Sequence, residues 1–240
     1  MELPTIHPVV RNRGMPGMMT KMDAGIAVHD GVRLRAVSQG TPIVFVVDDD
    51  FSILESLICN AGWQLETFGS AQEFLRRQQV LVPSCLVLDI PLPGLNGLDL
   101  QKRLVVDRKD MPIIFVTDQY DVAAAVQAMK AGAFDFLARP FCDDVLLSTV
   151  QQAIECSRTA LWHEVKVRCL RDRYMLLSRR EREVMALVVA GLLNKQVGFE
   201  LGISEITVKA HRGQVMRKMK AGSLADLVKM AVELHVSPAA

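Results

Sequence analysis

Short apolar runs alternate with amphipathic stretches between residues 42 and 155. Runs rich in β-branched and aromatic residues predict strands over Ile43–Val47, Gln64–Phe68, Cys85–Asp89, Ile113–Thr117 and Phe134–Leu137. Helical patterns follow these runs over Ser52–Asn60, Ser70–Gln79, Asn96–Val105 and Asp121–Ala131, and from Asp143 or Asp144 to at least Ile154. This alternation predicts an α/β fold, with a doubly wound, flavodoxin-like, five-stranded parallel sheet in the order 2-1-3-4-5.

The chain on either side of this region has other patterns. Residues 1–41 show no sustained period and cluster Pro, Gly and Met, so we predict a poorly ordered N-terminal tail. A start codon upstream of the natural one explains this stretch equally well. Residues 158–175 are mostly helical in pattern and rich in both charges, which indicates a helical linker. Independent loops are the alternative for the linker.

Four helices are predicted in an all-α domain over residues 176–240. They span Ser178 to near Gly191, Asn194–Leu201, Glu205–Met219 and Ser223–Leu234. Ser178 and Glu181 form a capping box at the start of the first helix. A tight turn at Gly202, Ile203 and Ser204 joins the second helix to the longer, basic third helix. This arrangement is typical of a helix-turn-helix.

The charges divide the chain at similar places. Residues 41–155 carry a net charge of −8 and residues 156–240 a net charge of +7, although the whole chain is at +1. A basic helix-turn-helix indicates a nucleic-acid partner. The five cysteines are scattered without a CxxC pair, which favours reduced thiols over a zinc site or a disulfide frame. We find no apolar run long enough for a membrane span and no signal peptide, so we expect a cytoplasmic protein without membrane attachment.

Chemically active side chains stand where the predicted strands end. Asp48 and Asp49 follow the first strand, Asp89 ends the third, and Thr117 and Arg139 come at the fourth and fifth. The carboxyl ends of parallel strands share one edge, and the first and third strands flank the switch point, so these groups are expected to gather there. Clustered carboxylates repel one another unless a cation joins them, and oxygen ligands with room for water suit Mg²⁺. One aspartate would remain as a nucleophile for a phosphoryl group.

The period of the third C-terminal helix assigns its two faces. Its inward stripe is predicted to be Val208, Val215 and Met219, at spacings of seven and four. The outward face is predicted to hold Ile206, Lys209, Ala210, Gly213, Gln214, Arg217 and Lys220. Small residues at Ala210 and Gly213 would let the helix sit deep in a major groove, where Lys209 and Arg217 would meet phosphates or guanine edges.

Five motifs stand in order in the α/β region: Val46–Asp50, Leu86–Asp89 with Pro93–Gly97, Phe115–Thr117, Ala128–Ala133 and Arg139–Phe141. Together they resemble the receiver domain of two-component response regulators, over about residues 42–157. The resemblance implies that Asp89 accepts phosphate from a sensor histidine kinase. It also implies that Mg²⁺ is held by Asp48, Asp49, Asp89 and the backbone carbonyl of Pro91. Thr117 would then follow the phosphoryl group, and Phe136 would be the aromatic that swings inward with it.

Two features depart from the receiver pattern. The family has lysine where this chain has Arg139, so a planar fork replaces a compact charge. The segment from Asp50 to Gly62 is nearly one helical turn shorter than is usual there, so either the first helix repacks or the loop before Trp63 absorbs the change. The alternative is therefore a phosphorylation-independent receiver that serves as a dimerisation module. An Asp-nucleophile phosphatase is rejected, because Pro91 stands where its second acid would be.

Three motifs stand in the C-terminal region: Leu177–Val184, Gly191–Gln196 and Ile206–Arg212. They resemble the LuxR-type DNA-binding domain, over about residues 176–236, and the two halves together resemble FixJ/NarL-type response regulators. The resemblance implies a non-enzymatic transcription regulator that binds a double-stranded promoter operator, as a homodimer when active. The candidate DNA-binding residues are Lys195, Thr207, Lys209, Ala210, Arg212, Gly213, Gln214 and Arg217.

Overall fold

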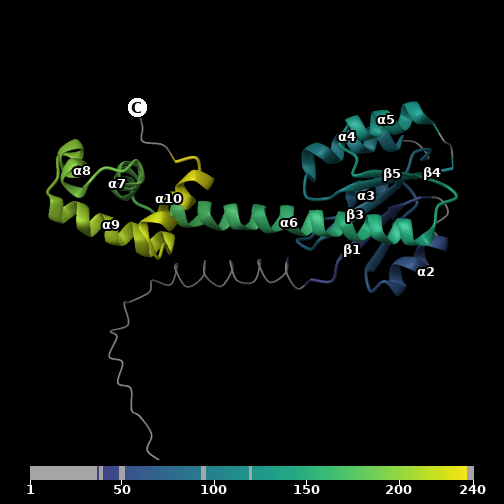
Figure 1. The fold of residues 1–240 in the computed structure, drawn as a ribbon, viewed down its shortest axis with the longest axis horizontal. Helices are drawn as coiled ribbons and strands as arrows, with labels where there is room; N and C mark the ends of the chain where they lie inside the picture. The colour runs from purple at the N-terminus through teal and green to yellow at the C-terminus, as the bar shows by residue number, and fades with distance from the viewer. Residues whose placement is uncertain (1–36, 38–39, 49–51, 93–95, 119–120, 237–240) are drawn as a thin grey trace, which may run out of the picture.

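The computed structural model describes residue 37 and residues 40–48, 52–92, 96–118 and 121–236. Figure 1 shows a sheet covered by helices, a separate bundle of helices, and one long helix that joins them. Within the described ranges, no helix combines the length and the apolar character that a membrane crossing requires.

A five-stranded parallel sheet organises the first domain. Its strands are β1 (Ile43–Val47), β2 (Gln64–Phe68), β3 (Ser84–Asp89), β4 (Ile113–Thr117) and β5 (Asp135–Ala138). They lie in the order β2-β1-β3-β4-β5, so the predicted fold class and strand order are confirmed. The register pairs Val47 of β1 with Leu88 of β3. Asp48, which follows β1, and Asp89, which ends β3, are thereby brought to the same edge of the sheet.

Helices cover both faces of the sheet. They are α2 (Ser52–Asn60), α3 (Ala71–Arg76), α4 (Gly97–Asp107), α5 (Val122–Lys130) and the first part of α6 (Asp143–Met175). On one face, Phe74 of α3, Leu100 of α4 and Ala128 of α5 share a core with Phe45 of β1. On the other face, α2 and α6 pack against the alternate side chains of the strands. The all-buried central strands explain why their sequences read as continuous apolar runs.

Helix α6 runs without interruption for 33 residues, from Asp143 to Met175. Its sequence contains neither Gly nor Pro, so nothing local breaks the helix. Figure 1 shows it leaving the sheet and reaching the helical bundle. Residues 158–175 lie within this helix, so their predicted helical conformation is confirmed and the alternative of independent loops is wrong.

The bundle contains α7 (Arg179–Val189), α8 (Asn194–Leu201), α9 (Glu205–Met219) and α10 (Leu224–Glu233). The capping box at α7 is confirmed, because the Ser178 hydroxyl accepts from the Glu181 N–H and the Glu181 carboxylate accepts from the Ser178 N–H. Helix α8 ends at Gly202, whose φ of 63° lies in the left-handed region that favours glycine. Ser204 then caps α9, as a helix-turn-helix requires.

Helix α3 differs from its prediction at its carboxyl end. It ends at Arg76, three residues before Gln79, because Arg77 turns to an extended backbone and pairs with Glu66 of β2. At its start, the Ser70 hydroxyl accepts from the N–H of Glu73, and the Glu73 carboxylate accepts from the N–H of Gly69.

Candidate functional site

Asp89 lies at the carboxyl end of the central strand β3 and is only 6% exposed. One of its carboxylate oxygens accepts from the N–H of Ile90 at 2.6 Å. The start of α4 presses against this strand end, and a Cβ on Gly97 would lie 2.5 Å from the carbonyl oxygen of Asp89. The Gly97 N–H donates to the carbonyl of Ile90 at 3.1 Å. A glycine is therefore needed where α4 begins.

Arg139 bridges the acidic edge of the sheet. Its Nη2 lies 2.6 Å from Oδ2 of Asp48, which is 2% exposed, and its Nη1 lies 3.6 Å from Oδ1 of Asp118. The side chain of Asp48 is thus already engaged by a cation of the protein. A guanidinium fork reaches both carboxylates at once, which a single ammonium does less readily.

The surroundings of Asp89 leave the site short of positive charge. Burial, followed by the negative charges of Asp48 and Asp118, raises the pKa of Asp89 to about 6. The Ile90 N–H and the charge of Arg139 act in the opposite direction and only partly offset this rise. At neutral pH the carboxylate is ionised, and a further cation at this edge would relieve the repulsion.

The donor set fits Mg²⁺ in kind. Asp48 and Asp89 supply buried carboxylate oxygens, and Pro91 follows at the exposed start of the next loop, where its carbonyl is a further oxygen donor. Asp49, the remaining predicted ligand, lies outside the described residues. Within the described part of the chain, no three His, Cys, Asp or Glu side chains come together as a metal-binding group.

The other predicted switch residues lie on or just after β4 and β5, which follow β3 on one side of the sheet. Thr117 ends β4 and is buried, and it pairs in register with Ala138, the residue before Arg139. Phe136 is half-buried on β5, with its ring centroid 6.5 Å from that of Phe115. The fold therefore brings Thr117, Phe136 and Arg139 to the same region of the sheet as Asp89.

Asp118 was missed by sequence reasoning. It immediately follows Thr117, contacts Arg139 and contributes to the raised pKa of Asp89. The rule that singled out Asp48 and Asp89, a carboxylate at a strand end, applies to it equally.

Replacing Asp89 by asparagine should stabilise the metal-free protein at neutral pH. Because the folded pKa of about 6 lies above the ordinary 3.8, the ionised carboxylate costs stability above pH 6, by at most about 3 kcal/mol. That cost shrinks as the pH falls from 6 towards 4, and it vanishes only well below pH 3.8, where the group is protonated in both the folded and the unfolded state. In urea denaturation with EDTA, the free energy of unfolding of Asp89→Asn should exceed that of the wild type at pH 7.5. The difference should be much smaller at pH 4.5.

The control for this measurement is Asp99→Asn on α4, whose carboxylate is largely exposed beside Lys102. It should change stability by less than about 0.5 kcal/mol at either pH. An Asp89→Asn advantage that is absent at pH 7.5, or equal at both values, would contradict the assigned electrostatics.

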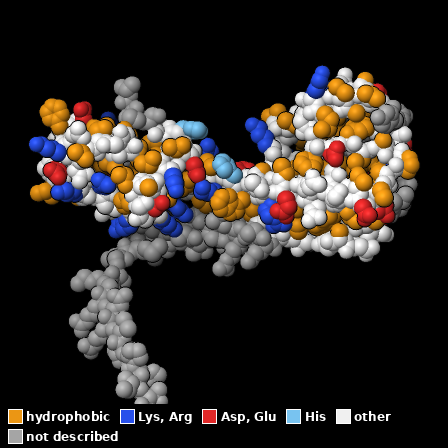
Figure 2. Space-filling view, in the orientation of Figure 1, with side chains coloured by type: hydrophobic (Ala, Val, Ile, Leu, Met, Phe, Trp, Pro, Cys, Tyr) orange, Lys and Arg blue, Asp and Glu red, His pale blue; other side chains and the backbone are white. Residues whose placement is uncertain are grey.

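The second candidate site is the outward face of α9. Val208, Val215 and Met219 are buried, as predicted, in the two small cores of the bundle. The predicted outward residues Ile206, Lys209, Ala210, Gly213, Gln214, Arg217 and Lys220 are all exposed. In Figure 2, Lys and Arg side chains are denser over the bundle than over the sheet domain. The helix therefore presents a basic face on which the small residues Ala210 and Gly213 add little side-chain bulk.

Several candidate DNA-binding side chains are held by neighbours. Lys209 pairs with Glu205 at 3.0 Å, and Arg217 donates to Gln214 at 2.6 Å. Thr207 lies 2.8 Å from the hydroxyl of the N-cap Ser204. Two charged candidates lie off the outward face of α9. Arg212 is half-buried and donates to Asn194 of α8 at 3.3 Å, whereas Lys195 is exposed on α8.

A buried ion pair orients α9, and sequence reasoning did not find it. Nζ of Lys218 lies 2.6 Å from the carboxylate of Glu181, which is 6% exposed, and 3.2 Å from the carbonyl of Leu176. Although burial raises the pKa of Glu181, hydrogen bonds from Lys218 and Ser178 bring it below its ordinary value. One residue of α9 is thus fixed to both α7 and the end of α6.

Comparisons with known proteins agree with this two-part arrangement. The family described as "Response regulator receiver domain" matches residues 44–151, and "Bacterial regulatory proteins, luxR family" matches residues 175–231. Nodulation protein W of Bradyrhizobium diazoefficiens is 48% identical over 198 residues, which cover 81% of this chain and 87% of that protein. Transcriptional regulatory protein FixJ of the same organism is 40% identical, over 79% of this chain and 94% of that protein.

A solved structure shares the overall arrangement. The low-resolution structure of the response regulator StyR superposes with a TM-score of 0.73, at 39% identity. The match covers 81% of this chain and all of that one.

Proposed function

Since this chain belongs to the FixJ/NarL-type response regulators, we propose that phosphate from a sensor histidine kinase is accepted on Asp89 and controls promoter binding. The chain is a transcriptional regulator with a receiver domain and a LuxR-type DNA-binding domain. The observation that carries the proposal is the position of Asp89, which ends the central strand beside the buried Asp48.

In the proposed reaction, a carboxylate oxygen of Asp89 attacks the phosphorus of a phosphohistidine, and the bond from phosphorus to the histidine nitrogen breaks. Thr117 would donate a hydrogen bond from its hydroxyl to a phosphoryl oxygen, and Arg139 would pair with another. Asp48, Asp49, Asp89 and the carbonyl of Pro91 would hold Mg²⁺, which neutralises charge on the phosphoryl group when bound. Phe136 would move inward with Thr117.

The proposed output is a change in association at the DNA. The phosphorylated receiver forms a homodimer in the cytoplasm, and its two C-terminal domains occupy the two half-sites of a promoter operator. The domain bounds that we propose are 42–157 for the receiver, 158–175 for the helical linker and 176–240 for the DNA-binding domain. Residues 1–41 precede the receiver. The two family matches, which fall over residues 44–151 and 175–231, support this division.

Phosphorylation is tested by incubating the full chain with Mg²⁺ and a small acyl phosphate, followed by intact-mass measurement. We expect one added phosphoryl group on the wild type and on Asp99→Asn, and none on Asp89→Asn. Arg139→Lys should increase the modified fraction, because its ammonium binds a phosphoryl oxygen as a compact charge and releases the fork from Asp48. A phosphoryl group that persists in Asp89→Asn would refute the assignment.

One observation favours an alternative function. The 2.6 Å contact between Arg139 and Asp48 engages a proposed metal ligand with the protein's own cation. A receiver locked in this way would act as a phosphorylation-independent dimerisation module for the DNA-binding domain. This alternative would be supported if the wild-type protein stays unmodified in the acyl phosphate assay and the Arg139→Lys variant gains the phosphoryl group.

DNA binding by α9 is tested by Lys209→Ala, which removes an exposed charge from the proposed face. Affinity for a short double-stranded DNA should fall several-fold. The negative slope of log K against log salt should become shallower, by about one in magnitude. Lys130→Ala removes the same charge from the exposed end of α5 and should change neither quantity. Equal behaviour of the two variants at several salt concentrations would contradict the assigned face.

A further inference from the structure

The linker helix α6 carries an apolar stripe between the two domains. Leu161, Val165 and Cys169 follow at intervals of four residues, which places them on one face of the helix. They are 1%, 3% and 3% exposed. The stripe begins one turn after Ser157, whose hydroxyl still accepts an N–H from β3, and ends before Tyr174, which joins the core of the bundle. It spans about 12 Å of helix and belongs to neither domain core.

Val37 packs on this stripe. It is fully buried and forms one cluster with all three side chains. Its carbonyl oxygen accepts a hydrogen bond from Nη1 of Arg158, also on α6, at 3.3 Å. One valine side chain covers only part of three side chains that spread along about 12 Å of helix. Cys169, at the far end of the stripe, also lines a cavity with Lys229 and Met230 of α10.

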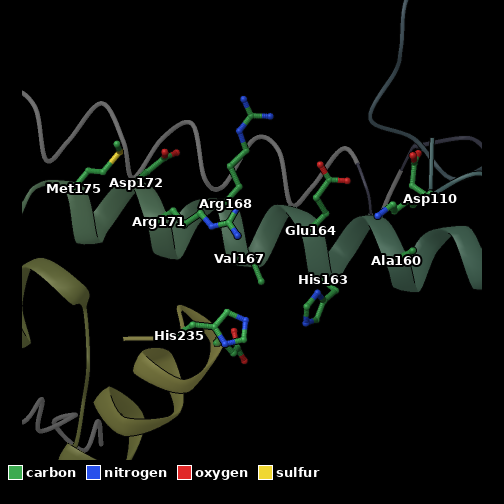
Figure 3. A pocket seen from close by; sticks show the side chains of 12 residues that line it. Asp110, Ala160, His163, Glu164, Val167, Arg168, Arg171, Asp172, Met175 and His235 are labelled. Atoms are coloured by element: carbon green, nitrogen blue, oxygen red, sulfur yellow. The ribbon is translucent and has the colours of Figure 1, made fainter. Parts of the chain in front are cut away.

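A different face of α6 is polar. A cleft of about 860 Å³ lies between this part of the helix, the loop before β4 and the end of α10. Its lining includes His163, Glu164, Arg168 and Arg171 of α6, and Figure 3 shows these side chains along the helix with His235 across the cleft. Helix α6 is thus amphipathic where it crosses between the domains. An apolar partner would therefore pack on the stripe and not on the polar face.

We propose that the N-terminal segment, defined as residues 30–40, docks on the α6 stripe of its own chain with Val37 as the anchor. Val37 stands six residues before β1 begins at Ile43, so the tether keeps the segment at a high local concentration beside the stripe. The segment carries two further apolar residues, Val32 and Leu34. Docked there, it braces the connection between the domains and denies the stripe to a second copy of α6.

The test uses the reaction of the cysteines of the full chain with a maleimide, quantified by peptide mass spectrometry. Cys169 in the stripe should react roughly 100-fold more slowly than the exposed Cys156 on the same helix. Val37→Asp should raise the Cys169 rate at least about tenfold, because a carboxylate is not accommodated among apolar side chains. Thr41→Asp places the same charge at an exposed position four residues later and should leave the rate unchanged.

Two further readouts decide between explanations. Cys85, fully buried in β3, reports opening of the receiver and should stay unmodified in every variant. If the maleimide modifies Cys85 in Val37→Asp, that variant has opened the receiver. The milder Val37→Ala then replaces it, with the same comparison of the Cys169 rate to that of the wild type. Protection of Cys169 that is unchanged on 100-fold dilution of the protein supports the intramolecular segment. Protection lost on dilution would assign the stripe to a second copy, and protection unaffected by either Val37 variant would equally overturn the proposal.

Discussion

Gly97→Ala is expected to destabilise the receiver by about 3 kcal/mol and to slow phosphorylation of Asp89 roughly 100-fold. The added Cβ would lie 2.5 Å from the carbonyl oxygen of Asp89 and 3.2 Å from both Cα of Ile90 and Cε1 of Phe115. Two of these three atoms are backbone of the central strand and the loop that follows it, so no side-chain rotation relieves the contact. Strand β3 is paired on both sides, by β1 and β4, and cannot retreat without breaking a ladder.

The change acts on chemistry as well as on stability, because the atom struck belongs to the proposed phosphoacceptor residue. A displaced Asp89 backbone moves the carboxylate relative to Asp48 and Thr117. Urea denaturation of the full chain gives the stability, and the acyl phosphate assay gives the rate. Both measurements are needed, since a merely unfolded fraction would lower the extent of modification and leave the rate of the folded fraction unchanged.

Gly69→Ala is the matched control in the same domain. No atom lies within 4 Å of a Cβ built there, and its backbone is not in the left-handed region. It should change stability by less than about 0.5 kcal/mol and leave the rate intact. Similar losses in both variants, or a Gly97→Ala protein that is as stable and as fast as the wild type, would show that the approach of α4 does not constrain Asp89.

The acidic edge was predictable because it depends on topology alone. Apolar runs that end in aspartate, placed on a parallel sheet of known order, bring Asp48 and Asp89 together without knowledge of any side-chain contact. The close approach of Gly97 was not predictable in the same way, since it depends on the angle at which α4 meets β3. The pairing of Arg139 with Asp48 likewise follows from a rotamer that tertiary packing selects.

Element bounds failed where a long-range contact overrides local propensity. The residues after Arg76 have good helical propensity, yet α3 stops there because Arg77 is drawn to Glu66, eleven residues earlier. The faces of α9 were predicted correctly, because a helix period needs only local sequence. The ion pair of Lys218 with Glu181 was missed, since 37 residues separate the partners and neither sequence neighbourhood indicates the other.

Gly198→Ala is expected to destabilise the DNA-binding domain by about 2 kcal/mol or more and to weaken binding to double-stranded DNA accordingly. Gly198 lies in α8, where a Cβ would come within 2.8 Å of the carbonyl oxygen of Ile203. The Ile203 N–H already donates to the Gly198 carbonyl at 3.0 Å, so the turn is tied to the helix at this point. Alanine gains about 1 kcal/mol in helix propensity. This gain does not offset the close contact of its Cβ with the Ile203 carbonyl, because the turn holds that backbone in place.

Relief of that contact requires the turn to move away from α8, and the turn carries the start of α9 with it. Val208 follows directly, since its Cγ2 lies 3.7 Å from the same position and it joins the core beneath α9. The exposed face with Lys209 and Arg217 would therefore change its angle to the rest of the bundle. DNA binding should fall even under conditions in which circular dichroism still reports a folded bundle.

Gly213→Ala makes the same substitution on the outward side of α9, where a Cβ meets no atom within 4 Å. Because a helix-interior glycine is replaced without strain, this variant should gain up to about 1 kcal/mol in thermal or urea denaturation. The contrast between the two glycines separates packing from propensity, because the propensity change is nominally the same in both. Equal stabilisation by both substitutions would show that the α8 to α9 turn tolerates displacement, and that the angle of the recognition helix is not fixed at Gly198.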